Sequence, residues 1–146
     1  MKVKELVEKL NLKVLSGEKG LDREIDGCYI SDLLSDVMGN AMEGNIWITL
    51  QTHKNVMAVA SLKEMSCIIL VKNLMPNDET IEQSNDEDLP ILQTNLPTYE
   101  IAGLVYNLLH QTQPIRQSFP LPSWRRNRLS AKAERHLPST KDYLHV

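Results

Sequence analysis

The stretch that decides the fold is Asn45-Ile-Trp-Ile-Thr-Leu-Gln-Thr-His-Lys-Asn-Val-Met-Ala-Val-Ala-Ser-Leu62. Its first part, residues 45–50, is rich in β-branched and aromatic side chains, which is typical of a buried strand. From Asn55 the apolar side chains take up helical spacing, so a helix follows almost at once. Between the two, Thr52 is predicted to cap the first helical turn, whose N–H groups have no partner inside the helix. The stretch therefore predicts a strand that runs straight into a helix.

Strands and helices alternate on both sides of this stretch. Strands are predicted at 12–16, 25–31, 66–72 and 89–94, and helices at 2–10, after the capping pair Ser31-Asp32, at 78–87 and from Pro97. Residues 66–72 form an almost continuous apolar run, which indicates a strand covered on both faces in a parallel sheet. The pattern predicts an α/β fold: a compact, three-layer-like domain with a mostly parallel sheet and alternating helices.

The character of the chain changes after Gln111. Residues 112–146 contain five of the six arginines and four of the seven prolines, and the helical periodicity stops there. We therefore expect residues 1–111 to form the folded domain and residues 112–146 to be a basic, Pro- and Arg-rich, disordered tail. The abrupt change from lysine to arginine also fits a fused or frameshifted terminus.

Charge and composition exclude several classes of protein. Residues 1–111 carry nine basic and 17 acidic side chains, a net charge of −8, whereas the tail carries +5. An acidic body argues against nucleic-acid binding, which depends on Lys and Arg contacts to phosphate. Residues 1–10 contain five charges and the chain has no long apolar run, so we expect a cytoplasmic protein without a membrane span. Cys28 and Cys67 are isolated and are expected to be reduced.

Polar side chains follow three of the predicted strands. Because parallel strands end at the same edge of a sheet, we expect these loops to lie together and to hold any small ligand. The helix starts there offer N–H donors to an anionic group. Each residue also has a structural interpretation, as a cap, a strand end or part of a solvated helix start. The candidate ligand-binding residues are Ser31, Asp32, Asp36, Thr49, Gln51, Thr52, His53, Thr94 and Asn95.

The sequence contains no complete catalytic motif. Neither a Ser/His/Asp order, a Walker A sequence nor a Rossmann fingerprint is present. His53 is the one histidine beside the expected ligand loops, and it has no partners at metal-ligand spacing. We expect no metal, no cofactor and no enzymatic activity.

Four separated motifs resemble those of the small stand-alone DRTGG-domain proteins. They are residues 29–39, 47–53, 58–61 and 94–103, and the resemblance covers about residues 1–111. The eponymous Asp-Arg-Thr-Gly-Gly string is absent, and Asp22-Arg23-Glu24 is a partial echo of it. Pro97 stands where the family usually has a serine, so the capping hydroxyl of the last helix is missing.

The resemblance implies a compact α/β fold, similar to the N-terminal domain of HPr kinase/phosphorylase. Such domains accompany CBS domains in nucleotide-regulated pyrophosphatases and a phosphate acetyltransferase, and no enzymatic activity is attached to the domain itself. Stand-alone members tend to be encoded near iron-hydrogenase and other redox genes. The implied function is a regulatory module that binds a small ligand, such as an adenine nucleotide, or a partner protein of a redox complex. The alternative is an interaction scaffold without a small-molecule ligand.

The last predicted helix also bears on assembly. Its apolar stripe is wide for a peripheral helix, and Gly103 permits close approach of another element. A twofold partner would cover this surface, so we expect a homodimer.

Overall fold

The computed structural model describes residues 1–111, and the predicted disordered tail lies outside these residues. Residues Met1–Leu109 form a compact unit. The elements in chain order are α1 (Val3–Leu10), β1 (Lys13–Ser16), the 3₁₀ helix η1 (Glu18–Gly20), β2 (Cys28–Ile30), α2 (Leu34–Asn40), β3 (Ile46–Thr49), α3 (Asn55–Leu62), β4 (Cys67–Leu70), α4 (Asp78–Asp86), β5 (Ile91–Gln93) and α5 (Thr98–Leu109). The predicted alternation of strands and helices is confirmed.

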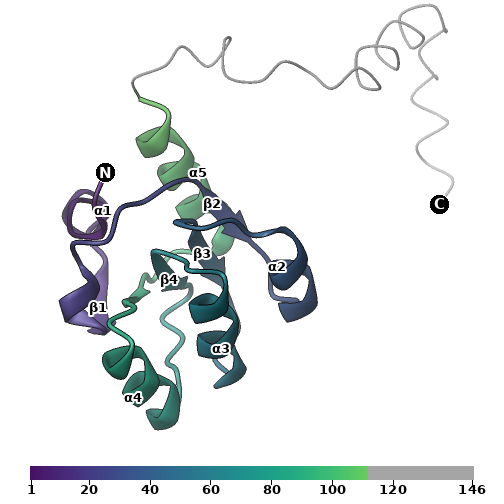
Figure 1. Ribbon diagram of the computed structural model, residues 1–146. Coiled ribbons are helices and arrows are strands. Elements are labelled where there is room, and N and C mark those ends of the chain that lie inside the picture. Colours follow the sequence, from purple (N-terminus) through teal and green to yellow (C-terminus); the bar gives the residue numbers. More distant parts are fainter. Residues whose placement is uncertain (112–146) are drawn as a thin grey trace, which may run out of the picture. The chain divides into compact units, whose positions relative to one another are not determined.

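The five strands form one sheet in the order β1-β5-β4-β3-β2 (Figure 1). Strands β2 to β5 are parallel to one another and adjacent in chain order, and only β1 runs antiparallel, beside β5. The prediction of a mostly parallel sheet is therefore confirmed. The β2 strand forms one edge of the sheet and β1 forms the other.

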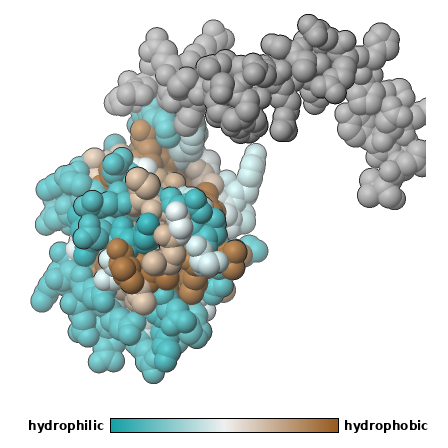
Figure 2. Space-filling model, turned by 45° about the vertical axis from the view of Figure 1, so that its right-hand side comes forward, coloured by the Kyte–Doolittle hydropathy of each residue, from teal (hydrophilic) through white to brown (hydrophobic). Residues whose placement is uncertain are grey.

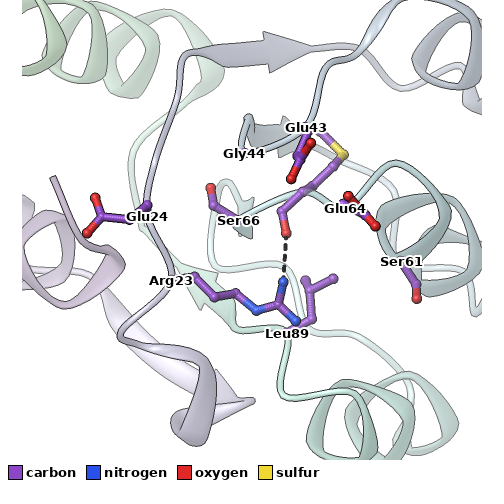
Figure 3. A pocket seen from close by; sticks show the side chains of 9 residues that line it. Arg23, Glu24, Glu43, Gly44, Ser61, Glu64, Ser66 and Leu89 are labelled. Atoms are coloured by element: carbon purple, nitrogen blue, oxygen red, sulfur yellow. Dashed lines mark hydrogen bonds between the residues drawn. The ribbon is translucent and has the colours of Figure 1, made fainter.

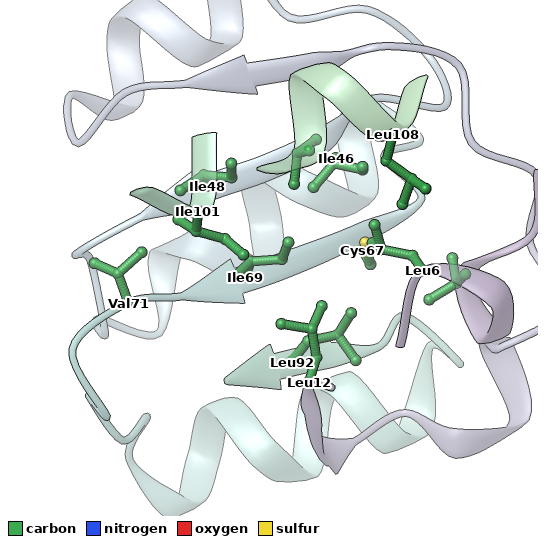
Figure 4. Close-up of a cluster of buried hydrophobic side chains, with 12 residues drawn as sticks. Leu6, Leu12, Ile46, Ile48, Cys67, Ile69, Val71, Leu92, Ile101 and Leu108 are labelled. Atoms are coloured by element: carbon green, nitrogen blue, oxygen red, sulfur yellow. The ribbon is translucent and has the colours of Figure 1, made fainter. Parts of the chain in front are cut away.

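Hydrophobic cores cover both faces of the sheet. Every residue of β3 and β4 is buried, because successive side chains point to opposite faces and both faces carry helices. One core joins α1 and α5 to the sheet through residues such as Ile48, Ile69 and Ile101 (Figure 4). The other joins α2 and α3 to Trp47 and Ile68. The domain therefore has three layers, as the sequence predicts.

Trp47 packs in the second core and holds the loop that follows β2. Its side chain is fully buried, and its indole Nε1 donates a hydrogen bond of 2.8 Å to the carbonyl oxygen of Ser31. A buried indole N–H without a partner would be unfavourable, so this bond sets where the chain leaves β2.

The predicted helix caps are wrong at three places. Thr52 does not cap α3, which begins at Asn55 without a side-chain cap. Neither Ser31 nor Asp32 caps α2, which begins at Leu34. The sequence Gly39-Asn40 predicts a left-handed helix end, but both residues lie inside α2, and the following residue has an extended conformation. At the start of α2, Ser31 and Asp32 bond to other loop groups instead.

Gly20, at the end of η1, packs closely against the backbone of the segment that precedes β5. A Cβ atom at Gly20 would lie 1.9 Å from the carbonyl oxygen of Asp88, which is backbone and cannot rotate away. Gly39, in contrast, is exposed in α2 and has no atom within 4 Å of such a Cβ. The two glycines thus form a matched pair for testing this close backbone approach.

We predict that Gly20→Ala lowers the free energy of unfolding by about 2 kcal/mol, because the added methyl group forces the backbone apart. Gly39→Ala should raise it by up to about 1 kcal/mol through better helix propensity. Urea unfolding monitored by circular dichroism measures both. Equal midpoints for wild type and Gly20→Ala would contradict the close approach.

Candidate functional site

The three loops predicted to bind a ligand emerge at the same end of the sheet, since β2, β3 and β5 are parallel. The loops 31–36 and 49–53 follow neighbouring strands. Strand β4 separates them from residues 94–95, which places the third loop about 10 Å from the end of β3. The structure thus brings two of the loops into contact and keeps the third apart.

Asp32 ties the first two loops together. Its carboxylate oxygen Oδ1 accepts hydrogen bonds from Thr49 Oγ1 at 2.9 Å and from the backbone N–H of Leu50 at 2.7 Å. The side chain of Gln51 donates back to the carbonyl oxygen of Asp32 at 2.9 Å. Three of the predicted ligand residues therefore bond to one another, and they hold the loop after β3 in a fixed position.

Asp36 has partners of its own and forms no pair with Asp32. Its carboxylate accepts hydrogen bonds from the Tyr29 hydroxyl at 2.8 Å and from Asn40 Nδ2 at 3.0 Å. Hydrogen bonds from Ser31 and from Tyr29 lower the pKa of the Asp36 carboxyl below its ordinary value. The same bond to Asp36 raises the pKa of Tyr29. This cluster anchors α2 to β2.

The groups around the start of α3 are also engaged. His53 Nδ1 accepts a bond of 3.2 Å from the N–H of Asn55, and the His53 carbonyl oxygen accepts the N–H of Val56 at 3.0 Å. Lys54 lies 3.8 Å from the carboxylate of Glu79. Thr52 is half-buried, and His53 is exposed. This helix start therefore has fewer free N–H donors than the sequence suggests.

The polar groups of the third loop, residues 94–95, also bond within the protein. Thr94 is buried, its N–H donates to the Leu70 carbonyl oxygen at 3.0 Å, and its Oγ1 accepts the N–H of Leu96 at 3.2 Å. Asn95 is exposed. Of the predicted residues, Thr52, His53 and Asn95 thus keep the most side-chain polar atoms available to a ligand.

The structure of residues 1–111 also bears on metal ligands, on the two cysteines and on membrane spans. No group of three or more His, Cys, Asp or Glu side chains in this range is placed to hold a metal ion. Cys28 and Cys67 are free, and burial raises the pKa of each thiol to about 12. Within the same range, no helix has the length and apolarity that a membrane span requires.

A cavity of about 440 Å³ lies at the opposite end of the sheet, where β3, β4 and β5 begin (Figure 3). Sequence reasoning did not find it, because its walls come from segments far apart in the chain. Its lining includes Arg23, Glu43, Ser61, Glu64, Ser66 and Leu89.

Arg23 holds one wall of this cavity. Its guanidinium donates to the carbonyl oxygens of Asp88 at 2.8 Å, Glu87 at 3.1 Å and Met65 at 3.5 Å. These bonds connect the segment before β2 to the C-terminal end of α4. One signal in the sequence could have indicated this role: Arg23 is the only arginine of residues 1–111, and a planar group with five donors suits several acceptors at once.

The Asp36 cluster makes the stability of the fold depend on pH. A carboxyl whose folded-state pKa lies below the ordinary 3.8 stabilises the fold above pH 3.8, and this contribution is lost as the pH falls through the folded-state pKa.

We predict that Tyr29→Phe moves the pKa of Asp36 up towards 3.8, because one donor to the charged form is removed. Side-chain NMR titration measures this pKa. The control Tyr99→Phe, at an exposed tyrosine, should leave it unchanged, and an unaltered pKa in Tyr29→Phe would contradict the assignment.

Several curated proteins are similar to this chain. HPr kinase/phosphorylase of Brevibacillus brevis is 30% identical over 122 residues, which cover 73% of this chain and 39% of the relative. HPr kinase/phosphorylase of Bacillus cereus is 25% identical over 124 residues, covering 75% of this chain and 40% of the relative. The chain thus spans about two fifths of the length of these relatives.

A solved structure shares the fold. It shows the CBS and DRTGG domains of the regulatory region of Clostridium perfringens pyrophosphatase, complexed with the activator diadenosine tetraphosphate. The TM-score is 0.59 at 12% identity, and the match covers 92% of this chain and 61% of that chain. The DRTGG domain matches residues 5–108, which is most of the chain. The resemblance seen in the sequence motifs is confirmed, and the protein belongs to the DRTGG domain family.

Proposed function

We propose that this protein is a non-catalytic regulatory module that binds a small ligand, with an adenine nucleotide as the first candidate. The observation that supports this most is the shared fold with a pyrophosphatase regulatory region that was solved with a nucleotide activator. The chain spans only two fifths of its HPr kinase/phosphorylase relatives, and we do not extend their catalytic activity to it.

The proposed ligand site spans the three loops at the carboxyl ends of β2, β3 and β5. The N-terminal ends of α3 and α5 lie at this end of the sheet, and their dipoles favour the phosphate groups of a nucleotide. Tyr99 follows shortly after Asn95, is 89% exposed, and offers an aromatic face to an adenine ring. Thr52, His53 and Asn95 supply polar contacts without a strong charge.

The cavity at the other end of the sheet is a poorer site for phosphates. Glu24, Glu43 and Glu64 line it, against the single cation of Arg23. Like charges without a metal between them would repel a nucleotide. The carboxyl end also has two acidic side chains, Asp32 and Asp36, but their carboxylates already accept hydrogen bonds from the protein, which makes this end the better site.

Binding of a nucleotide should raise the melting temperature of the full chain, because only the folded state has the site. At tenfold excess over the dissociation constant the shift should be about 6 °C. ATP, AMP and diadenosine tetraphosphate are the nucleotides to test. Thr52→Ala combined with His53→Ala should abolish the shift without changing the melting temperature of the free protein.

The matched control replaces Glu82 and Gln83 by Ala, since both are exposed on α4. This variant should keep the full shift. A nucleotide whose NMR perturbations map to the beginnings of the strands, or a shift that survives in the Thr52/His53 variant, would overturn the proposed site.

An interaction scaffold is the second candidate function. Large apolar side chains are exposed around the ends of β2 and β3 and on α2, including Ile30, Leu33, Met38 and Leu50. Figure 2 shows hydrophobic side chains gathered across one face of the molecule, bounded by hydrophilic ones. Such surfaces often mark a protein contact, and a partner from a redox complex would fit the genomic setting that the family resemblance implies. No response to any nucleotide, together with capture of a defined partner on this face, would favour this candidate.

We also propose that the protein is a homodimer that uses the outer face of α5. This face has a single charged side chain, Glu100, and exposes Gly103 and Leu104. A Cβ atom at Gly103 would meet nothing within 4 Å, so a helix of a second copy could approach closely there.

Leu104→Lys should convert the dimer into a folded monomer, because it places a charge in the apolar contact. Sedimentation velocity at tens of micromolar measures the association state, and circular dichroism checks the fold. Gln83→Lys, on exposed α4, is the control and should remain dimeric. A wild-type chain that sediments only as a monomer would rule out the dimer.

A further inference from the structure

The cavity at the beginnings of β3, β4 and β5 contains opposite charges that do not neutralise each other. Glu43 and Glu64 line it together with Arg23. Among the ion pairs formed within residues 1–111, none joins Arg23 to either carboxylate. The third acid of the lining, Glu24, lies 3.5 Å from the amino group of Met1. Two carboxylates and one guanidinium therefore face the same space separately (Figure 3).

The backbone that carries the two glutamates is held in place by hydrogen bonds. The N–H of Gly44 donates to the carbonyl oxygen of Glu64 at 2.9 Å, and the N–H of Asp26 donates to Gly44 at 2.8 Å. Gly44 has φ +79°, and a Cβ atom there would lie 3.1 Å from Asp26. The backbone contact thus places Glu43 and Glu64 next to each other, with both exposed side chains free to adjust to a ligand.

The helix termini around the cavity add to its preference for cations. The cavity lies just beyond the C-terminal ends of α2, α3 and α4, through Glu43, Glu64 and Leu89. The C-terminal end of a helix carries a partial negative charge, and unpaired carbonyl groups there accept hydrogen bonds. Arg23 already takes up the carbonyl groups at the end of α4. The remaining acceptors therefore favour a positively charged ligand on the side of Glu43 and Glu64.

The acidic side chains of the site are not grouped as ligands of a single metal ion. No three acidic, His or Cys side chains of residues 1–111 lie close enough to share one. A ligand that satisfies these groups must instead carry separated charges: cationic groups for the two carboxylates and an anionic group for the guanidinium. Three of the five guanidinium N–H groups donate to backbone, which leaves donors for a carboxylate.

We propose that this cavity binds a basic α-amino acid, such as lysine or arginine. The α-ammonium and the side-chain cation contact Glu43 and Glu64, and the α-carboxylate contacts Arg23. The ligand charge of +1 matches the −1 of these three groups. Ser61 and Ser66 also line the cavity and offer hydroxyl oxygens, while Met65 and Leu89 provide an apolar floor for the methylene chain. The cavity volume of about 440 Å³ lies within the range of small-molecule sites.

The test is an NMR titration of the full chain with four compounds. L-lysine and L-arginine should bind with a dissociation constant on the order of 1 mM, because the charges are partly solvated. Their perturbations should centre on the amides of Glu43, Gly44, Glu64 and Ser66. Cadaverine lacks only the carboxylate of lysine and norleucine lacks only its side-chain ammonium, so each should bind at least about fivefold more weakly.

Glu43→Gln combined with Glu64→Gln should weaken lysine binding about tenfold while leaving the melting temperature unchanged, since both side chains are exposed. The control Glu5→Gln with Glu8→Gln removes the same charge from α1 and should not alter binding. The proposal is overturned by an absence of saturable shifts, by equal affinity in the two double variants, or by cadaverine binding as tightly as lysine. The nucleotide proposal stands or falls separately, because its perturbations map to the other end of the sheet.

Discussion

The burial of β3 and β4 on both faces is the constraint on which the rest of the structure depends. Every side chain of Ile46–Thr49 and Cys67–Leu70 is buried. Full burial of one large apolar side chain stabilises a fold by about 1.5–3 kcal/mol, so these strands are stable only when helices cover both sides. The interior then has little room for polar groups. Hydrogen-bonding and charged chemistry is confined to the two ends of the strands, which is where the candidate sites lie.

The strand order determines where a ligand crevice can form at the ends of the sheet. Strands β2 to β5 are adjacent in chain order, and the helices between them cover one face (Figure 1). Ligand crevices in open α/β sheets form where the strand order reverses, so none is built between β2 and β3. Side chains such as Asp32 join those loops directly. The chain changes face after β5, where α5 begins, and Asn95 and Tyr99 are exposed there.

The sequence predicted the elements better than it predicted their ends. Continuous apolar runs and helical spacing identify β3, β4 and α5 because local burial sets these patterns. The cap prediction at Asp32 was wrong because its carboxylate bonds to residues 17 and 18 positions away, and the one at Thr52 was wrong because α3 begins three residues later, at Asn55. The contacts of Arg23 span 42 to 65 positions, so no local pattern could reveal them or the cavity that they border. The sequence placed the loops 31–36 and 49–53 at the same end of the sheet correctly, because parallel pairing follows from the βα alternation.

The parallel arrangement also separates the electrostatics of the two ends. Helices that follow parallel strands place their N-termini at the carboxyl ends of the strands and their C-termini at the opposite end. The first end favours anions, and the second favours cations. Glu43 and Glu64 reinforce this division at the second end, whereas at the first end Asp32 and Asp36 oppose it and are satisfied by hydrogen bonds within the protein. Arg23 is the exception at the second end, and because backbone carbonyls hold its guanidinium, it remains a fixed cation in acidic surroundings. A small α/β domain can therefore present two ends of opposite electrostatic preference on a single sheet.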